Sequence, residues 1–155
     1  PLIYDDLDVF ISKIKKLGFL VKLDTNGMHP DKLQEIIDKG IVDYIAMDVK
    51  YPKSSYIELT GGKSAYKKIS KSIQIIMNSG IDYEFRTTYV KGIHSLDSVE
   101  QIASLIKDSK IYYIQNFREG KSIDPTLSSI NSFSPTELKK IKQIAKKYIK
   151  NVVIR

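Results

Sequence analysis

The chain has 155 residues, of which 42% are hydrophobic and 28% are charged, and we expect residues 1–155 to form a single domain. No apolar run approaches the roughly 20 residues that a membrane-spanning helix needs, and no basic-then-apolar leader is visible, so we expect a cytoplasmic protein without a membrane partner. Cysteine is absent, which excludes a disulfide framework, a zinc ribbon and an iron–sulfur cluster ligated by this chain itself.

The net charge of +7 raises the alternative of a basic module that binds RNA or acts as a scaffold. The lysines, however, are interleaved with the apolar positions of helical segments, as at Lys13, Lys15 and Lys16. Charged residues normally occupy the outer face of such helices. We therefore interpret the positive charge as solvated helix surface and do not expect nucleic acid as a partner.

Segments with helical spacing of apolar residues alternate with short apolar runs along the chain. We expect helices at about 7–17, 30–39, 64–79, 97–107 and 134–148. We expect strands at about 19–24, 42–49, 83–90, 111–117 and 151–155. Glycine follows a helix and precedes a strand at Gly18, Gly40 and Gly80, which is typical of a repeated helix–strand unit. Such alternation predicts an α/β fold with a parallel sheet and right-handed crossovers.

The last of these helices carries a start signal of its own. In Ser134-Pro135-Thr136-Glu137, Ser134 can cap the helix while Glu137 reaches back to it, which is a capping box. At the other end of the chain, Pro1 is followed almost at once by a helical pattern. A strand that would feed this first helix is missing, so we expect the chain to be a fragment of a longer protein.

Side chains alternate across a strand, and this alternation predicts one polar face on the sheet. The residues expected on it are Leu20, Lys22 and Asp24 in the first strand, Tyr44, Ala46, Asp48 and Lys50 in the second, and Glu84, Arg86 and Thr88 in the third. A parallel sheet covered by helices on both faces would be apolar on both. The pattern therefore favours a curved or barrel-like sheet around a wet, polar cavity.

The residues expected in that cavity have both signs of charge and several amides and hydroxyls. They are Asp24, Asp48, Lys50, Arg86, Thr25, Asn26, Gln115 and Asn116. Charges of both signs in one cavity must pair with one another or meet a ligand, because an isolated buried charge is costly. A zwitterionic ligand would suit both signs, and an internal ion-pair network that satisfies itself is the alternative.

Other motifs are weaker. Thr60-Gly61-Gly62-Lys63-Ser64 is similar to a phosphate-binding loop, but it lacks the full spacing and a clear preceding strand, so we interpret it as a loop leading into a helix. His29 and His94 follow strands but are far apart in the sequence, and we interpret both as loop histidines rather than a metal pair. His94 could still line the rim of the cavity.

An ordered series of motifs resembles the radical S-adenosylmethionine activating enzymes. The motifs are Leu23-Asp24-Thr25-Asn26-Gly27, Tyr44-Ile45-Ala46-Met47-Asp48-Val49-Lys50, and Tyr83-Glu84-Phe85-Arg86-Thr87-Thr88 followed by Gly92-Ile93-His94. Within that family the series is most similar to the activating proteins of anaerobic ribonucleotide reductase, which are relatives of the pyruvate formate-lyase activases. The resemblance implies a partial (β/α) barrel with an open side.

The resemblance also implies site residues. The strand ends and turns that match the S-adenosylmethionine site of the family carry Asp24, Thr25, Asn26, Asp48, Lys50, Arg86, Gln115 and Asn116. Among these, Asp24 and Thr25 match positions beside the methionyl part of the cofactor and, with Asp48, a monovalent cation site. Lys50 and Arg86 match cations that contact the cofactor, and the last two residues match the strand end near the adenosine. Asn26 is included only as a neighbour.

The chain departs from the family at its start. The family begins with a CxxxCxxC loop that binds a [4Fe–4S] cluster, and its next strand ends in a Gly-Gly-Glu-Pro motif. Pro1 matches the proline of that motif, so we expect the cluster ligands to be absent from this chain and the fragment to be inactive, with no catalytic residue of its own.

For the parent protein, the resemblance implies reductive cleavage of S-adenosylmethionine and formation of a glycyl radical on a partner. We expect that partner to be anaerobic ribonucleotide reductase and expect an electron donor as well. The alternative within the family is a radical S-adenosylmethionine enzyme that acts on a small molecule or peptide.

Overall fold

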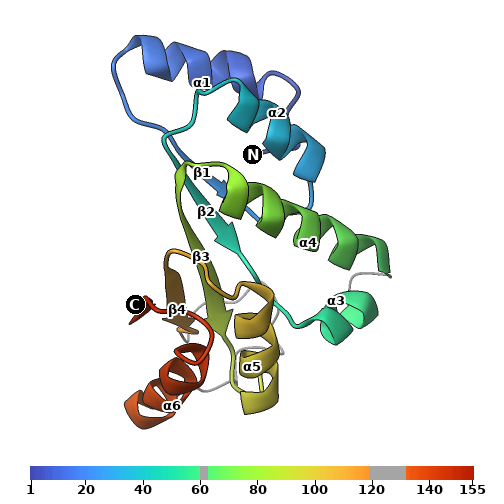
Figure 1. Cartoon of the computed structure of the whole chain (residues 1–155), viewed down its shortest axis with the longest axis vertical. Coiled ribbons are helices and arrows are strands. Elements are labelled where there is room, and N and C mark those ends of the chain that lie inside the picture. Colours follow the sequence, from blue (N-terminus) through green and yellow to red (C-terminus); the bar gives the residue numbers. More distant parts are fainter. Residues whose placement is uncertain (60–62, 119–131) are drawn as a thin grey trace.

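The structure of the chain is a computed structural model that describes residues 1–59, 63–118 and 132–155. Helices and strands alternate along it (Figure 1). The elements in chain order are α1 (Leu7–Lys16), β1 (Lys22–Thr25), α2 (Pro30–Asp38), β2 (Tyr44–Asp48), α3 (Lys53–Leu59), α4 (Lys63–Asn78), β3 (Asp82–Tyr89), α5 (Leu96–Leu105), β4 (Tyr112–Asn116), α6 (Pro135–Ala145) and β5 (Val152–Ile154). The predicted α/β alternation is confirmed.

The strands form one sheet in the order β1-β2-β3-β4-β5, and every neighbouring pair is parallel. Because the strand order follows the chain order and such crossovers are right-handed, the connecting helices fall on one face of the sheet. Figure 1 shows them gathered along that face. The chain thus forms a partial (β/α) barrel, and the opposite face of the sheet is left for polar groups.

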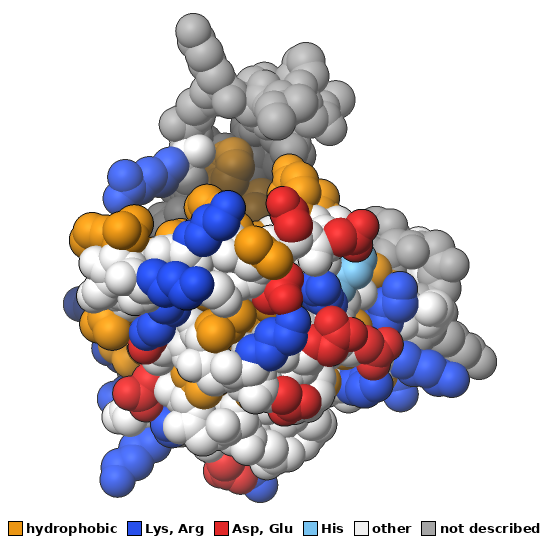
Figure 2. Space-filling view, turned by 90° about the horizontal axis from the view of Figure 1, so that it is seen from above, with side chains coloured by type: hydrophobic (Ala, Val, Ile, Leu, Met, Phe, Trp, Pro, Cys, Tyr) orange, Lys and Arg blue, Asp and Glu red, His pale blue; other side chains and the backbone are white. Residues whose placement is uncertain are grey.

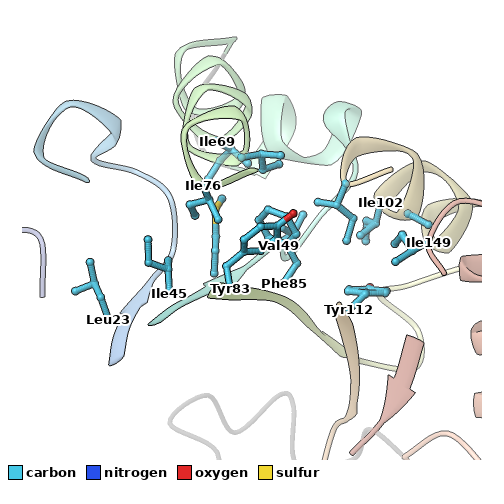
Figure 3. Close-up of a cluster of buried hydrophobic side chains, with 14 of the residues drawn as sticks. Leu23, Ile45, Val49, Ile69, Ile76, Tyr83, Phe85, Ile102, Tyr112 and Ile149 are labelled. Atoms are coloured by element: carbon cyan, nitrogen blue, oxygen red, sulfur yellow. The ribbon is translucent and has the colours of Figure 1, made fainter. Parts of the chain in front are cut away.

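The core lies between the sheet and these helices. Figure 3 shows Leu23, Ile45, Phe85 and Tyr112 on the strands facing the same layer as helical Ile69. All five side chains are buried. Alternate strand residues therefore meet the helices, which leaves the residues between them, such as Asp24 and Arg86, for the other side of the sheet.

The first strand starts later than predicted. Hydrogen bonding to the second strand begins at Val21, whose carbonyl accepts from the amides of Asp43 and Tyr44. Phe19 and Leu20 precede this point and are 62% and 82% exposed. An apolar run is thus not sufficient to extend a strand whose neighbour in the sheet begins only at Tyr44.

Two other details concern helices. The segment Lys53–Leu59, which the periodicity did not predict, forms the short helix α3, and its Tyr56 is buried. The capping box at the start of α6 is confirmed, since Ser134 Oγ accepts from the Glu137 amide and the Glu137 carboxylate accepts from the Ser134 amide.

The candidate phosphate loop lies mostly outside the described residues, because 60–62 are among the undescribed ones. Within the described part of the chain, no helix is long and apolar enough to cross a membrane.

The turn after β1 is packed tightly against the core. Gly27 has a φ of +75°, and a Cβ atom built on it would lie 2.2 Å from Met47 Cε and 3.2 Å from Ile69 Cδ1. The Gly27 carbonyl also accepts a buried 2.8 Å hydrogen bond from Ser72 Oγ on α4. Glycine is therefore required here for its backbone conformation and for lack of space.

Replacing Gly27 by alanine should lower the free energy of unfolding by about 1–2 kcal/mol for the left-handed backbone, and by about 1 kcal/mol or more for repacking the buried Met47. Gly80→Ala is the matched control, because Gly80 has a φ of +74° but nothing within 4 Å of its Cβ position. Urea unfolding of both variants measures the difference. Equal losses would show that the close approach at Gly27 does not matter.

Candidate functional site

Arg86, in the interior of β3, bridges the carboxyl ends of β1 and β2 on the polar face of the sheet. Its Nη1 lies 2.6 Å from Asp24 Oδ1 on β1, and its Nε lies 2.8 Å from Asp48 Oδ1 on β2. The register explains this arrangement, since Asp48 pairs directly with Arg86 and Asp24 pairs with Ala46, whose small side chain leaves the space between the two acids open. Three of the predicted site residues are thus in direct contact.

The guanidinium is well enclosed while its two partners face solvent. The Arg86 side chain is 16% exposed, whereas those of Asp24 and Asp48 are 52% and 37% exposed. Desolvation acts to lower the pKa of Arg86, but the hydrogen bond and charge of Asp48 and the charge of Asp24 outweigh it, so the pKa is raised. Arg86 is therefore a permanent cation that holds the two carboxylates side by side.

Glu84 forms a second layer of charge beneath this cluster. It is only 2% exposed, and its carboxylate accepts from Lys22 Nζ at 3.1 Å, Tyr44 Oη at 3.1 Å and Arg155 Nη1 at 3.3 Å. Arg86 Nη1 lies 3.7 Å away. A buried carboxylate with this many donors is fully compensated, and it supports Arg86 from below.

The alternation of side chains predicts Glu84 on the polar face, but Glu84 is not among the predicted site residues. Its signal was the alternation itself, which puts it two residues before Arg86 on the same face of β3. Its burial could not be inferred, because this depends on Tyr44 from the next strand and on Arg155 from the end of the chain covering it.

The predicted turn residues lie at the rim. Thr25 Oγ1 accepts from the Gly27 amide and Asn26 Oδ1 accepts from the Met28 amide, both at 3.1 Å. Together with Asp24, Asp48 and His29, and with the first residues of the chain, they line a cavity of about 320 Å³. His29 was interpreted as a generic loop residue, and the structure adds it to this lining.

A monovalent cation at Asp24, Thr25 and Asp48 stays a prediction. In the structure both acids direct a carboxylate oxygen at Arg86, so the guanidinium occupies the position between them. Within the described residues, no group of three or more histidines, cysteines or acids is arranged to hold a metal ion.

Lys50 lines a second cavity, which shares Asp48 with the cavity described above. The volume of this second cavity is about 230 Å³, and Thr88 and the ring of His94 also line it, among other residues. The Lys50 side chain is exposed, and among the described residues it forms no ion pair. Of the two predicted cations, Lys50 is therefore the one without an ion-pair partner among the described residues.

The two predicted residues of β4 are separate from this cluster. Gln115 accepts from Thr88 Oγ1 at 3.3 Å on the polar face. The amide of Asn116 instead bonds the backbone of Phe133 twice, at 2.8 and 3.0 Å, and so anchors the segment before α6. The contacts of Asn116 are structural ones, and its role beside a cofactor stays a prediction.

The positive charge of the chain does not gather on the face that Figure 2 shows, where Lys and Arg side chains lie beside Asp and Glu. Elsewhere in the described residues, lysines also pair with acids, as Lys15 does with Asp43 and Lys71 with Asp31. This face offers no continuous basic surface of the kind that nucleic-acid binding uses.

Glu84→Gln should lower the free energy of unfolding by about 1–3 kcal/mol, because it removes a charged acceptor from a buried network. Asp82→Asn is the control on the same strand, since Asp82 pairs with Lys110 at the surface and should cost less than about 1 kcal/mol. Denaturant unfolding of both variants tests this. A loss for Glu84→Gln no larger than the control would show that the network does not stabilise the fold.

The same variant should change the titration of Tyr44. Burial of this phenol, and then its hydrogen bond to Glu84, raise its pKa to about 12. The stability that Tyr44 contributes is therefore present below its ordinary pKa of 10 and is lost as the pH rises through about 12.

Glu84→Gln should lower the pKa of Tyr44, which NMR of the tyrosine ring carbons measures. Tyr148 is the internal control, because its pKa is raised by a different acid, Glu100, and should not move. An unchanged pKa at Tyr44 would argue against the contact with Glu84.

Comparison with known proteins agrees with this architecture. The sequence family described as the Radical SAM superfamily matches residues 1–106. The structure superimposes on a domain of pyruvate-formate lyase-activating enzyme from Bacteroides vulgatus with a TM-score of 0.77, covering 100% of this chain and 93% of that domain. At 14% identity this similarity concerns the fold alone.

Two proteins of Methanocaldococcus jannaschii, each named as a candidate glycyl-radical enzyme activating enzyme, are more similar in sequence. One is 36% identical over 100% of this chain and 67% of its own length, and the other is 30% identical over 98% of this chain and 58% of its own length. The chain thus spans about two thirds or less of these relatives. By the family match and the sequence identity, the chain belongs to the radical S-adenosylmethionine superfamily.

Proposed function

We propose that the protein containing this chain is a radical S-adenosylmethionine enzyme that generates a glycyl radical on a partner enzyme. The observation that carries the proposal is the 36% identity, over the whole of this chain, to a relative named as a candidate glycyl-radical enzyme activating enzyme. Anaerobic ribonucleotide reductase is the partner we propose, with a separate electron donor, on the resemblance of the strand motifs.

The charged residues of the polar face fit the amino acid end of S-adenosylmethionine. That end carries an ammonium and a carboxylate, and the site presents acids beside cations. Asp24 and Asp48 would face the ammonium, while Lys50 and Arg86 would face the carboxylate. Thr25, Asn26, Gln115 and Asn116 are proposed at the edges of the same site.

The cluster does not fit this chain. A [4Fe–4S] cluster is held by thiolates, and the sequence has no cysteine. We therefore assign its ligands to no residue of this chain and place them elsewhere in the whole protein. When bound beside such a cluster, S-adenosylmethionine supplies the radical chemistry.

The residues present have a binding and orienting role. Arg86 fixes Asp24 and Asp48 at 2.6 and 2.8 Å, so the positions of the two acids are set before a ligand arrives. Lys50 adds a charge that no carboxylate of the described residues neutralises. Pre-set charges of this kind reduce the ordering that binding would otherwise cost.

Lys50→Gln should weaken binding of S-adenosylmethionine by at least about tenfold, because it removes a charged donor to the ligand carboxylate. Equilibrium dialysis with the full-length protein measures the dissociation constant. Lys110→Gln is the control, since Lys110 precedes β4 at the opposite end of the strands and pairs with Asp82.

Three outcomes would decide against parts of the proposal. Equal binding by both lysine variants would remove Lys50 from the site. A full-length protein that binds S-adenosylmethionine but forms no glycyl radical, by electron paramagnetic resonance, with an anaerobic ribonucleotide reductase would favour a small-molecule or peptide substrate. Absence of S-adenosylmethionine binding, together with salt-dependent RNA binding, would favour the basic module instead.

A further inference from the structure

His94 lies where the loop after β3 meets the end of β2. It is only 8% exposed although it belongs to a loop. Its ring is stacked on Tyr51 with an interplanar angle of 9° and a centroid distance of 5.9 Å, and it meets Tyr89 edge-on at 5.2 Å. The packing fixes the plane of the imidazole, so its two nitrogens point in set directions.

Both ring nitrogens contact the backbone. The Val90 amide lies 3.0 Å from Nδ1, and the Lys50 carbonyl lies 2.8 Å from Nε2. An amide can only donate, so Nδ1 is an acceptor and the ring proton is on Nε2. The Val90 carbonyl lies farther from Nδ1, at 3.4 Å, so the shorter contacts have His94 donating through Nε2–H to the carbonyl of Lys50 and accepting at Nδ1 from the amide of Val90.

The backbone around Lys50 is held at each polar atom. The Lys50 amide donates to Tyr56 Oη at 2.8 Å, while its carbonyl accepts from His94. The preceding residue, Val49, is fixed as well, because its carbonyl accepts from Thr87 Oγ1 at 2.6 Å and its amide donates to the Arg86 carbonyl at 2.8 Å. The direction of the Lys50 side chain is set by this short segment, which has already left the strand.

His94 and the Lys50 side chain line the same cavity. Lys50, Asp48 and His94 all line the space of about 230 Å³ beside the cluster of Arg86. Without the contact to His94, the Lys50 carbonyl would lose its described partner at the rim of this cavity, and the peptide could turn. A substitution of His94 would then change the position of the Lys50 side chain, although His94 itself does not contact a ligand.

We propose that His94 is a positioning residue for Lys50: through Nε2–H it fixes the Lys50 carbonyl, and thereby aims the Lys50 ammonium into the cavity where an anionic group of the ligand binds. The inference rests on the proposed function, in which that group is the carboxylate of S-adenosylmethionine. The competing explanation is that His94 only closes its own loop through Val90.

Two substitutions separate these roles. His94→Gln can place an amide N–H near the position of Nε2 and so keep the donor to Lys50, but it loses the acceptor for Val90. His94→Asn can keep an acceptor for Val90 near the position of Nδ1, but it is too short to reach the Lys50 carbonyl. Each variant therefore preserves one contact and removes the other.

The test measures binding of S-adenosylmethionine to the full-length protein and its two variants by equilibrium dialysis. We expect His94→Asn to raise the dissociation constant about tenfold or more and His94→Gln to stay within about threefold of the unsubstituted protein. The reverse order, equal binding by both variants, or equal weakening of both would assign His94 to the loop and overturn the proposal.

Two measurements test the contact between His94 and the Lys50 carbonyl in the absence of a ligand. Nitrogen-15 NMR of the unsubstituted protein should show a proton on Nε2 of His94 and none on Nδ1, and a proton on Nδ1 would overturn the proposal. Amide hydrogen exchange at Lys50 and Tyr51 should accelerate in His94→Asn more than in His94→Gln, and the opposite order would contradict it. If the unsubstituted protein does not bind S-adenosylmethionine, the proposed function fails, while these two measurements still test the contact.

Discussion

The polar face depends on two ion pairs that the guanidinium of Arg86 forms. The guanidinium reaches from β3 to acids on two other strands, Asp24 on β1 and Asp48 on β2. A planar, permanently charged fork suits two carboxylates at once, whereas an ammonium would offer no such geometry. Because the strands are parallel and the sheet order follows the chain, these acids arrive at the same edge of the sheet, and one cation from β3 joins the ends of β1 and β2.

The balance of charge explains how so many ionised groups can share one face. Asp24, Asp48 and Glu84 are offset by Lys22, Arg86 and Arg155. This is the self-satisfying network that the sequence left as an alternative to a ligand site, because its acids and cations pair with one another. The network accordingly does not by itself argue for binding. That argument comes from Lys50, which is outside the network, and from the family to which the chain belongs.

Much of this could be read from the sequence, because period-two alternation and helix-ending glycines are local signals. These signals were sufficient to predict the parallel sheet, its polar face and the proximity of Asp48 and Arg86. Strand ends and loop side chains were not predictable in the same way. Leu20 lies outside the sheet because its partner strand starts later, and His94 turns inward because Tyr51 and Tyr89 pack on its ring. Such outcomes depend on residues distant in the sequence.

The pairing of Arg86 also restricts which ligand can enter. A ligand with only a positive group would have to compete with the guanidinium for Asp24 and Asp48, and would leave Arg86 in a partly buried position without them. A ligand with only a negative group would draw Arg86 away and leave the acids facing each other. In the proposed site a zwitterion would avoid both costs, since its ammonium would neutralise the acids as a point charge, without the fork geometry of the guanidinium, while its carboxylate would receive Arg86 and Lys50. This exchange would keep every charge paired, so the proposed site would favour an amino acid end over a simple cation or anion.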